Sequence, residues 1–264
     1  MTQDERLEFL IEVFRAEFKE YEKLCVPADR DGKRQLLRGL MNVRMPGPMS
    51  AEVLAVQDAY LCERAEEKGI IGLQDIPVIR NGLSVWQGDI TRLAVDAIVN
   101  AANSAMLGCF VPGHNCIDNC IQTYAGVQMR AECDRQMKLL KREYGQSYVQ
   151  PTAIPLLTDG YNLPAKKVVH IVGPVVTGPL TQKHRTELAA CYINTLDLCM
   201  REGLKSLAFC CISTGVFHFP NEEAAEIAVN TVRGWQETQG NVIERIIFNV
   251  FKDEDKKCYE NLIQ

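Results

Sequence analysis

From about Gly72 onward, short runs of β-branched and aliphatic residues alternate with longer segments of helical periodicity. The strands expected from these runs cover residues 83–86, 97–100, 167–172, 204–212 and 242–251. The helices expected between and after them cover residues 117–140, 182–202, 221–238 and 253–263. Strands that alternate with helices in this way predict a three-layer α/β/α fold around a mixed, mostly parallel central sheet.

The N-terminal part of the chain has a different pattern, and we expect a small helical region over residues 1–74 ahead of the α/β region 75–264. Thr2 and Glu5 have the spacing of a capping box, and apolar residues follow at helical intervals. Ser50 is expected to cap a later helix that runs toward Glu67. No catalytic pattern falls here, so we interpret the region as a helical cap or docking module.

Composition and charge exclude several classes of protein. The net charge is −5 and no dense Lys/Arg tract occurs, so binding to the phosphates of long nucleic acids is not expected. No apolar run approaches the roughly 20 residues needed to cross a bilayer, and the first residues lack the features of a signal peptide. The eleven cysteines are odd in number and scattered, which argues against a disulfide framework. We therefore expect a cytoplasmic monomer without a membrane or nucleic-acid partner.

Two polar segments follow expected strands, at the edge of the sheet where α/β proteins bind ligands. Asp89, in Gly88-Asp89-Ile90-Thr91, can accept a hydrogen bond from an exocyclic amine, or it can cap the turn. Asn100 and Asn103 come from the run Val99-Asn100-Ala101-Ala102-Asn103. Their amides can hydrogen-bond ribose hydroxyls as donors and acceptors, or they can form a turn.

A third segment joins a strand end to a helix through small residues. The loop consists of Ser213, Thr214, Gly215, Val216 and Phe217, and a helix is expected to begin near Asn221. Such a loop turns backbone N–H groups toward one point, and a following helix N-terminus adds a favourable potential for a phosphate. The order of strand, Ser-Thr-Gly loop and helix therefore favours a phosphate-binding site.

Together these three segments resemble the ADP-ribose-binding macrodomain family, over roughly residues 75–264. The closing run 246–251 and the acidic helix after it are similar to the MacroD-type branch. The resemblance implies that Asp89 and Ile90 hold the adenine, with Phe251 against its face. It also implies that Asn100 and Asn103 line the distal ribose. The diphosphate would be enclosed by Ser213, Thr214, Gly215, Val216 and Phe217.

The sequence departs from the MacroD pattern in the loop that precedes the family's catalytic aspartate, which aligns with Asp118. The glycine run of that loop is replaced by a longer segment that contains Cys109, His114 and Cys116. Two thiolates and an imidazole are a common zinc ligand set, and three protein ligands leave one position open, as in catalytic zinc sites. The departure matches the zinc-containing macrodomains, which usually occur beside a sirtuin-like ADP-ribosyltransferase. The sequence leaves open whether Cys120 joins the ligands, and whether the three residues are instead ordinary thiols and a surface imidazole.

The resemblance implies a zinc-dependent hydrolase that removes mono-ADP-ribose from ADP-ribosylated protein side chains. Asp118 and Asn103 would be its catalytic residues, with Asp118 orienting or deprotonating the attacking group. Zinc would coordinate a ribose hydroxyl or lower the pKa of a bound water. Two alternatives remain: a non-catalytic ADP-ribose reader with a structural zinc, and an O-acetyl-ADP-ribose deacetylase. His170 lies inside an expected strand and is interpreted as a core histidine.

Overall fold

The computed structural model describes residues 1–264, and its centre is a six-stranded sheet in the order β2-β8-β7-β4-β6-β5. Five neighbouring pairs make up the sheet, and all are parallel except β5 with β6, which is antiparallel. The strand bounds are β2 Leu83–Gln87, β4 Ala97–Ala102, β5 Leu156–Asp159, β6 Lys167–Val172, β7 Ser206–Phe209 and β8 Arg245–Val250. The inner strands are almost wholly buried, as expected of parallel strands covered on both faces.

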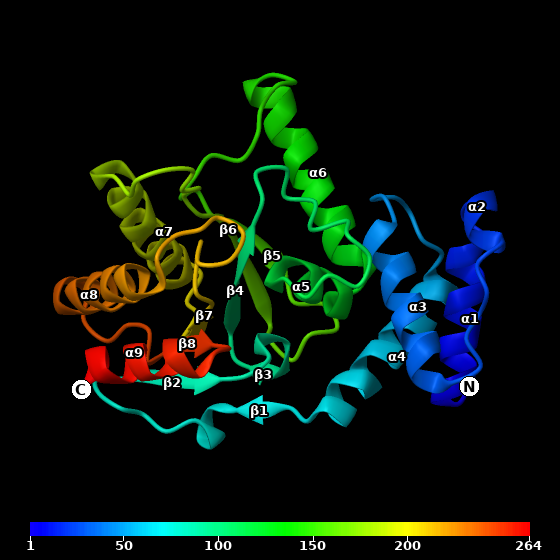
Figure 1. Cartoon of the computed structure of the whole chain (residues 1–264), viewed down its shortest axis with the longest axis horizontal. Coiled ribbons are helices and arrows are strands. Elements are labelled where there is room, and N and C mark those ends of the chain that lie inside the picture. Colours follow the sequence, from blue (N-terminus) through cyan, green and yellow to red (C-terminus); the bar gives the residue numbers. More distant parts are fainter.

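Helices cover both faces of this sheet (Figure 1). One face carries α5 (Ile117–Ala125) and α6 (Val127–Tyr144). The other carries α7 (Gln182–Arg201), α8 (Asn221–Gln239) and α9 (Asp253–Ile263), which contact one another in sequence. The predicted three-layer α/β/α fold with a mixed sheet is thus confirmed.

Two differences between the structure and the sequence prediction concern the central sheet and the helices that cover it. The single helix expected over residues 117–140 is two helices, because Gly126 takes a φ of +97° between α5 and α6. The edge strand β5 was not expected at all. It is only four residues long and pairs with β6 on one side, so its sequence carries little strand signal.

The N-terminal residues form a helical unit of α1 (Gln3–Arg15), α2 (Lys19–Glu22), α3 (Arg30–Val43) and α4 (Ala51–Lys68). Thr2 completes a capping box with Glu5, and Ser50 caps α4, as the sequence predicts. The unit has a small core of its own, made mainly of Leu7, Leu10, Ile11, Phe14, Leu37, Leu40, Met41, Tyr60 and Leu61.

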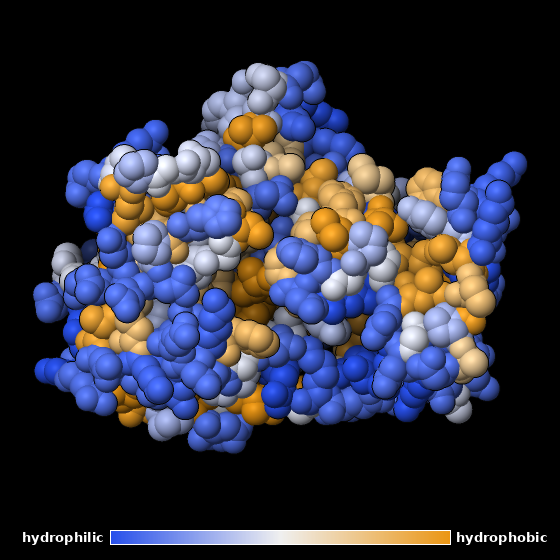
Figure 2. Space-filling model, viewed as in Figure 1, coloured by the Kyte–Doolittle hydropathy of each residue, from blue (hydrophilic) through white to orange (hydrophobic).

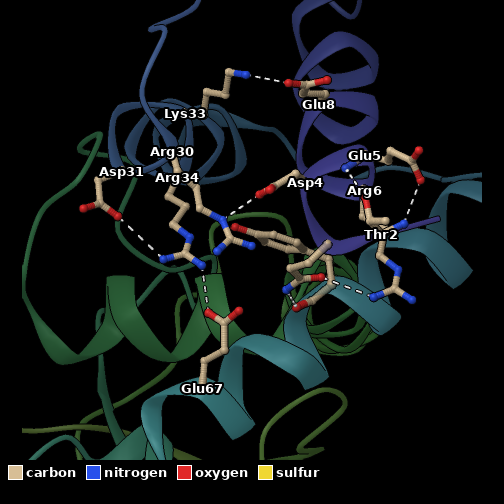
Figure 3. A network of polar contacts seen from close by, with 12 residues as sticks. Thr2, Asp4, Glu5, Arg6, Glu8, Arg30, Asp31, Lys33, Arg34 and Glu67 are labelled. Carbon is tan, nitrogen blue, oxygen red and sulfur yellow. Dashed lines mark hydrogen bonds and ion pairs between the residues drawn. The ribbon is translucent and has the colours of Figure 1, made fainter.

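Ion pairs surround that core (Figure 3). Arg30 pairs with Asp4 at 2.6 Å and Lys33 with Glu8 at 2.5 Å, which connects α3 to α1. Arg34 reaches Glu67 of α4 at 2.8 Å. These pairs are partly exposed, and such pairs contribute at most about 1 kcal/mol each. The apolar core therefore carries most of the packing energy of the unit.

The N-terminal unit packs on the α5 side of the sheet (Figure 1), where α3 and α4 both contact α5. After α4, the chain runs along one edge of the molecule, where β1 (Ile71–Gly72) pairs in parallel with β3 (Leu93–Ala94). Two short 3-10 helices, Leu73–Asp75 and Ile90–Arg92, lie beside these strands. None of the helices combines the length and apolar character that crossing a membrane requires.

Candidate functional site

The sequence-predicted segments meet at one edge of the sheet. Asn103 directly follows β4, Asp89 follows β2 by two residues, and Phe251 directly follows β8. Because β2, β4, β7 and β8 are parallel, their carboxyl ends lie on the same side. Figure 2 shows a hollow near the centre of this face, with apolar residues at its floor. The hollow is the candidate ligand cleft.

Asp118 lies in the first turn of α5 and is 6% exposed. Its Oδ1 accepts a hydrogen bond from Asn100 Nδ2 at 2.8 Å, and its Oδ2 accepts one from Asn103 Nδ2 at 3.3 Å. Burial raises the pKa of this carboxyl to about 6, although the two amides oppose the shift. The structure therefore joins the two residues for which catalysis is predicted.

Asn100 is fully buried, and its amide nitrogen contacts both Asp118 Oδ1 and His170 Nδ1. Its amide oxygen has no hydrogen-bond partner within the protein. The contact of Asn100 with a ribose therefore stays a prediction. Asn103 is less buried and donates to both Asp118 and the carbonyl of Gly108.

Cys109, His114 and Cys116 form a compact ligand group, with all ligand atoms within 4.8 Å of one another. Cys109 Sγ and His114 Nδ1 are 3.5 Å apart. Zinc bonds of about 2.0–2.3 Å in a tetrahedral site require ligand separations of about 3.5–3.8 Å, and the Cys109–His114 distance lies in this range. Two thiols and an imidazole are also donors that zinc prefers, so the chemistry of the group fits zinc. Cys120 lies outside the group, and its Sγ accepts a hydrogen bond from Arg38 Nη2 instead.

Cys116 is the N-cap residue of α5, and its Sγ accepts a hydrogen bond from the backbone of Asn119 at 3.4 Å. Burial raises the pKa of this thiol, and the neighbouring Cys109 raises it further. A bound cation would reverse that tendency, since a metal ion stabilises the thiolate. The position at a helix N-terminus favours the thiolate in the same direction.

The loop after β7 has the features of an anion site. Ser213 has a φ of +66°, and the N–H groups of Gly215, Val216 and Phe217 have no acceptor within the protein. The loop approaches Gly173 closely, since a Cβ there would lie 2.0 Å from Ser213 Oγ. Consecutive free N–H groups of this kind can surround a phosphate.

Asp89 is engaged by a residue that sequence analysis missed. Lys68 Nζ, at the end of α4, lies 2.5 Å from Asp89 Oδ2 and 3.7 Å from the centroid of the Tyr124 ring. Thr91 donates to Asp89 Oδ1 through both its backbone and its hydroxyl. Burial alone would raise the pKa of Asp89, but Lys68 and Thr91 outweigh it and lower the pKa.

Ile90 and Phe251 are the other two residues predicted to contact adenine. The side chain of Ile90 is only 3% exposed, so its backbone is the part available to a ligand. Phe251 is 78% exposed and forms an open aromatic face at the end of β8. No motif near Lys68 identifies it in the sequence, because its partner Asp89 is distant along the chain.

Comparisons with known proteins agree with this geometry. Residues 99–228 match the Macro domain family. A protein-ADP-ribose hydrolase of Treponema medium is 49% identical over 100% of both chains. A probable bifunctional ADP-ribose hydrolase/ADP-ribosyltransferase of Fusarium oxysporum is 40% identical, over 88% of this chain and 41% of its own length. The Trypanosoma brucei macrodomain in complex with ADP superposes with a TM-score of 0.65 at 27% identity, covering 87% of this chain and 96% of that one.

The mixed six-stranded sheet, its likeness to a solved macrodomain and the Macro domain match together show that the fold is that of the macrodomain class. With the sequence relationship over its full length, the chain belongs to the macrodomain family of protein-ADP-ribose hydrolases.

Proposed function

We propose that this chain is a zinc-dependent hydrolase that removes mono-ADP-ribose from modified protein side chains. The observation that carries the proposal is the position of the Cys109–His114–Cys116 group in the loop that leads into Asp118. Cys116, the last donor of this group, therefore lies two residues before Asp118, the buried carboxylate that contacts Asn103. Full-length relatives named protein-ADP-ribose hydrolase support the reaction.

ADP-ribose would bind along the hollow. Its adenine would meet Asp89, the backbone of Ile90 and the exposed ring of Phe251. Its diphosphate would accept hydrogen bonds from the free N–H groups of the loop after β7, which is formed by Ser213, Thr214, Gly215, Val216 and Phe217. Its distal ribose would then lie beside Asn103 and Asp118. Contacts to the nucleotide would thus position the reacting carbon.

Hydrolysis breaks the bond between C1″ of the distal ribose and the protein side chain, and water supplies the new hydroxyl. Asn103 would orient the ribose, and Asp118 would orient or deprotonate the attacking group. Asn100 would hold Asp118 in place from below. A zinc ion held by Cys109, His114 and Cys116 would supply Lewis acidity beside the ribose.

The experiment is to measure ADP-ribose release from a mono-ADP-ribosylated acceptor protein, with metal content determined on the same sample. We expect release to stop on chelation and to return with zinc. Cys116→Ser should lose zinc and reduce turnover by at least about 100-fold, because one of three ligands is removed. Cys25→Ser, at an exposed position in the N-terminal unit, should match the wild type.

Other results would favour the alternatives. A metal-free, fully active Cys116→Ser variant would contradict the zinc mechanism. Tight ADP-ribose binding and bound zinc without release from any acceptor would make the chain a reader with a structural metal. Release of acetate from O-acetyl-ADP-ribose alone would make it a metabolite deacetylase.

The modified acceptor would come from an ADP-ribosyltransferase, and we propose a sirtuin-like enzyme as the partner system. The Fusarium relative, whose name combines the hydrolase with a transferase in one chain, supports this pairing. We further propose that the chain acts as a monomer.

A further inference from the structure

The loop 109–116 is held through its backbone as well as through the ligand side chains. Asn119, fully buried in the first turn of α5, donates from Nδ2 to the carbonyls of Cys109 at 3.3 Å and Val111 at 2.9 Å. These bonds fix the first half of the loop to the helix that also carries Asp118.

The second half of the loop is held by α3 of the N-terminal unit. Arg38 Nη2 donates to the carbonyl of His114 at 2.7 Å and to Asn119 Oδ1 at 3.1 Å. Arg38 Nη1 reaches Asn115 Oδ1 at 3.2 Å. One guanidinium thus contacts the carbonyl of the imidazole ligand, the residue after it, and the amide that holds the start of the loop.

Asn42, one turn further along α3, completes the support. It is 1% exposed, and its Oδ1 accepts a hydrogen bond from the backbone of Gly113 at 2.9 Å. Its Nδ2 donates to Thr123 Oγ1 of α5 at 2.6 Å. Gly113 has a φ of +66°, so this bond stabilises the turn that directs His114 toward the two thiols.

Arg38 also contacts the sulfur of Cys120, which lies on α5 outside the ligand group. Its Nη2 lies 3.4 Å from Cys120 Sγ, one turn along α5 from Cys116. A metal ion bound to this sulfur would lie close to the guanidinium, and the two cations would repel each other, which disfavours Cys120 as a fourth ligand. Arg38 therefore contacts both the loop that carries the ligand group and the thiol of Cys120.

We propose that α3 is a positioning element of the metal loop, with Arg38 and Asn42 as positioning residues for the Cys109–His114–Cys116 group. The inference rests on the proposed zinc site. It gives the N-terminal unit a role in the reaction, in addition to the cap or docking role expected from sequence. Outer contacts to metal ligands typically change metal affinity by 10-fold to 100-fold.

The test uses the full-length chain, stripped of metal and titrated with Co²⁺, whose visible and thiolate charge-transfer absorption reports tetrahedral sulfur ligation. We expect Arg38→Ala to weaken Co²⁺ binding 10-fold to 100-fold and to alter the absorption bands. Arg38→Lys should recover part of the affinity, because an ammonium can reach one of the carbonyl acceptors. Asn42→Ala should weaken binding in the same direction.

The matched control is Arg34→Ala. Arg34 lies one turn before Arg38 on the same helix, and it contacts Glu67 and Asp31 but not the loop. We expect its Co²⁺ affinity and spectrum to equal those of the wild type. Circular dichroism and thermal midpoints establish that each variant is folded. If Arg38→Ala does not fold, Arg38→Lys takes its place in the test.

Unchanged affinity and spectrum in folded Arg38→Ala would overturn the inference while leaving the zinc site intact. An equal loss in Arg34→Ala would also overturn it, since the effect would then reflect general stability of α3. A wild-type chain that shows no thiolate-to-cobalt absorption would overturn the proposed zinc site, and the positioning role with it.

Discussion

At the scale of residues, buried hydrogen bonds from Asn100 to Asp118 and to His170 determine the protonation state of the histidine. Asn100 Nδ2 contacts Asp118 Oδ1 and His170 Nδ1, so the Nδ1 of His170 acts as an acceptor. The proton of the neutral ring is then on Nε2, which lies 3.0 Å from Thr158 Oγ1. His170 is fully buried, as the sequence predicts, and burial lowers its pKa to about 4.

A lowered pKa in the folded state makes stability depend on pH. Below the ordinary histidine pKa of about 6.5, the unfolded chain binds a proton that the folded chain does not bind until about pH 4. The contribution of His170 to the free energy of unfolding is therefore complete above pH 6.5 and is lost as the pH falls to 4. The slope amounts to about 1.4 kcal/mol per pH unit.

We expect His170→Gln to show a flatter dependence of unfolding free energy on pH between 6.5 and 4.5, because glutamine has no proton to bind. Urea unfolding of both proteins across this range, with chelator present, measures the difference. If the unfolding free energies of the two proteins depended on pH in the same way, the assignment of His170 as a neutral side chain in the folded state would be contradicted.

At the scale of elements, the break between α5 and α6 positions the site. Cys116 and Gly126 cap the two ends of α5, so the proposed zinc ligand Cys116 and Asp118 lie at the N-terminal end of a helix of only nine residues. A Cβ on Gly126 would lie 2.6 Å from both Gln57 Nε2 and Gln128 Oε1. The glycine is therefore required by both its φ and the close approach of α4.

We expect Gly126→Ala to lower the unfolding free energy by about 2 kcal/mol, from the positive φ and the displaced amides. Denaturant unfolding measures the change. Gly234→Ala is the control, since a Cβ there meets nothing within 4 Å in the middle of α8. Helix propensity should leave that variant equal to or up to about 1 kcal/mol more stable than the wild type. Equal stability of both variants would refute the conformational requirement.

At the scale of the whole molecule, one buried arginine joins the two units. Arg130 of α6 is 5% exposed and donates to the carbonyls of Met41, Asn42 and Arg44 at the end of α3. Its guanidinium also lies over the ring of Phe110, in the metal loop, at 4.4 Å. Burial lowers its pKa to about 10, which still leaves it charged at neutral pH. The Arg130 guanidinium thus connects the α/β unit with both the helical unit and the loop 109–116.

We expect Arg130→Met to lower the unfolding free energy by about 3 kcal/mol, because it leaves buried carbonyls without a donor. Urea unfolding measures the loss. Arg135→Met, on the same helix, removes only an exposed pair with Glu132 and should stay within about 0.5 kcal/mol of the wild type. Similar losses in the two variants would show that Arg130 does not couple the units.

The sequence alone determined what depends on neighbours along the chain. The alternation of strands and helices predicted the layers, and the segments at strand ends indicated the cleft. The proposed zinc ligands could be predicted because Cys109, His114 and Cys116 fall within eight residues, just before Asp118. Short spacing of this kind restricts the geometry that a loop can take, so the pattern predicts without tertiary information that the three side chains lie close together.

Only the tertiary structure decided which distant residues meet. Several contacts join residues from the two units. Lys68 pairs with Asp89, and Arg130 donates to carbonyls at the end of α3. Arg38 and Asn42 contact the backbone of the loop 109–116. Helical periodicity tells which side of a helix is apolar, but not which partner it faces or where a long polar side chain ends. Those contacts follow from how the N-terminal unit packs against α5, which no local pattern encodes.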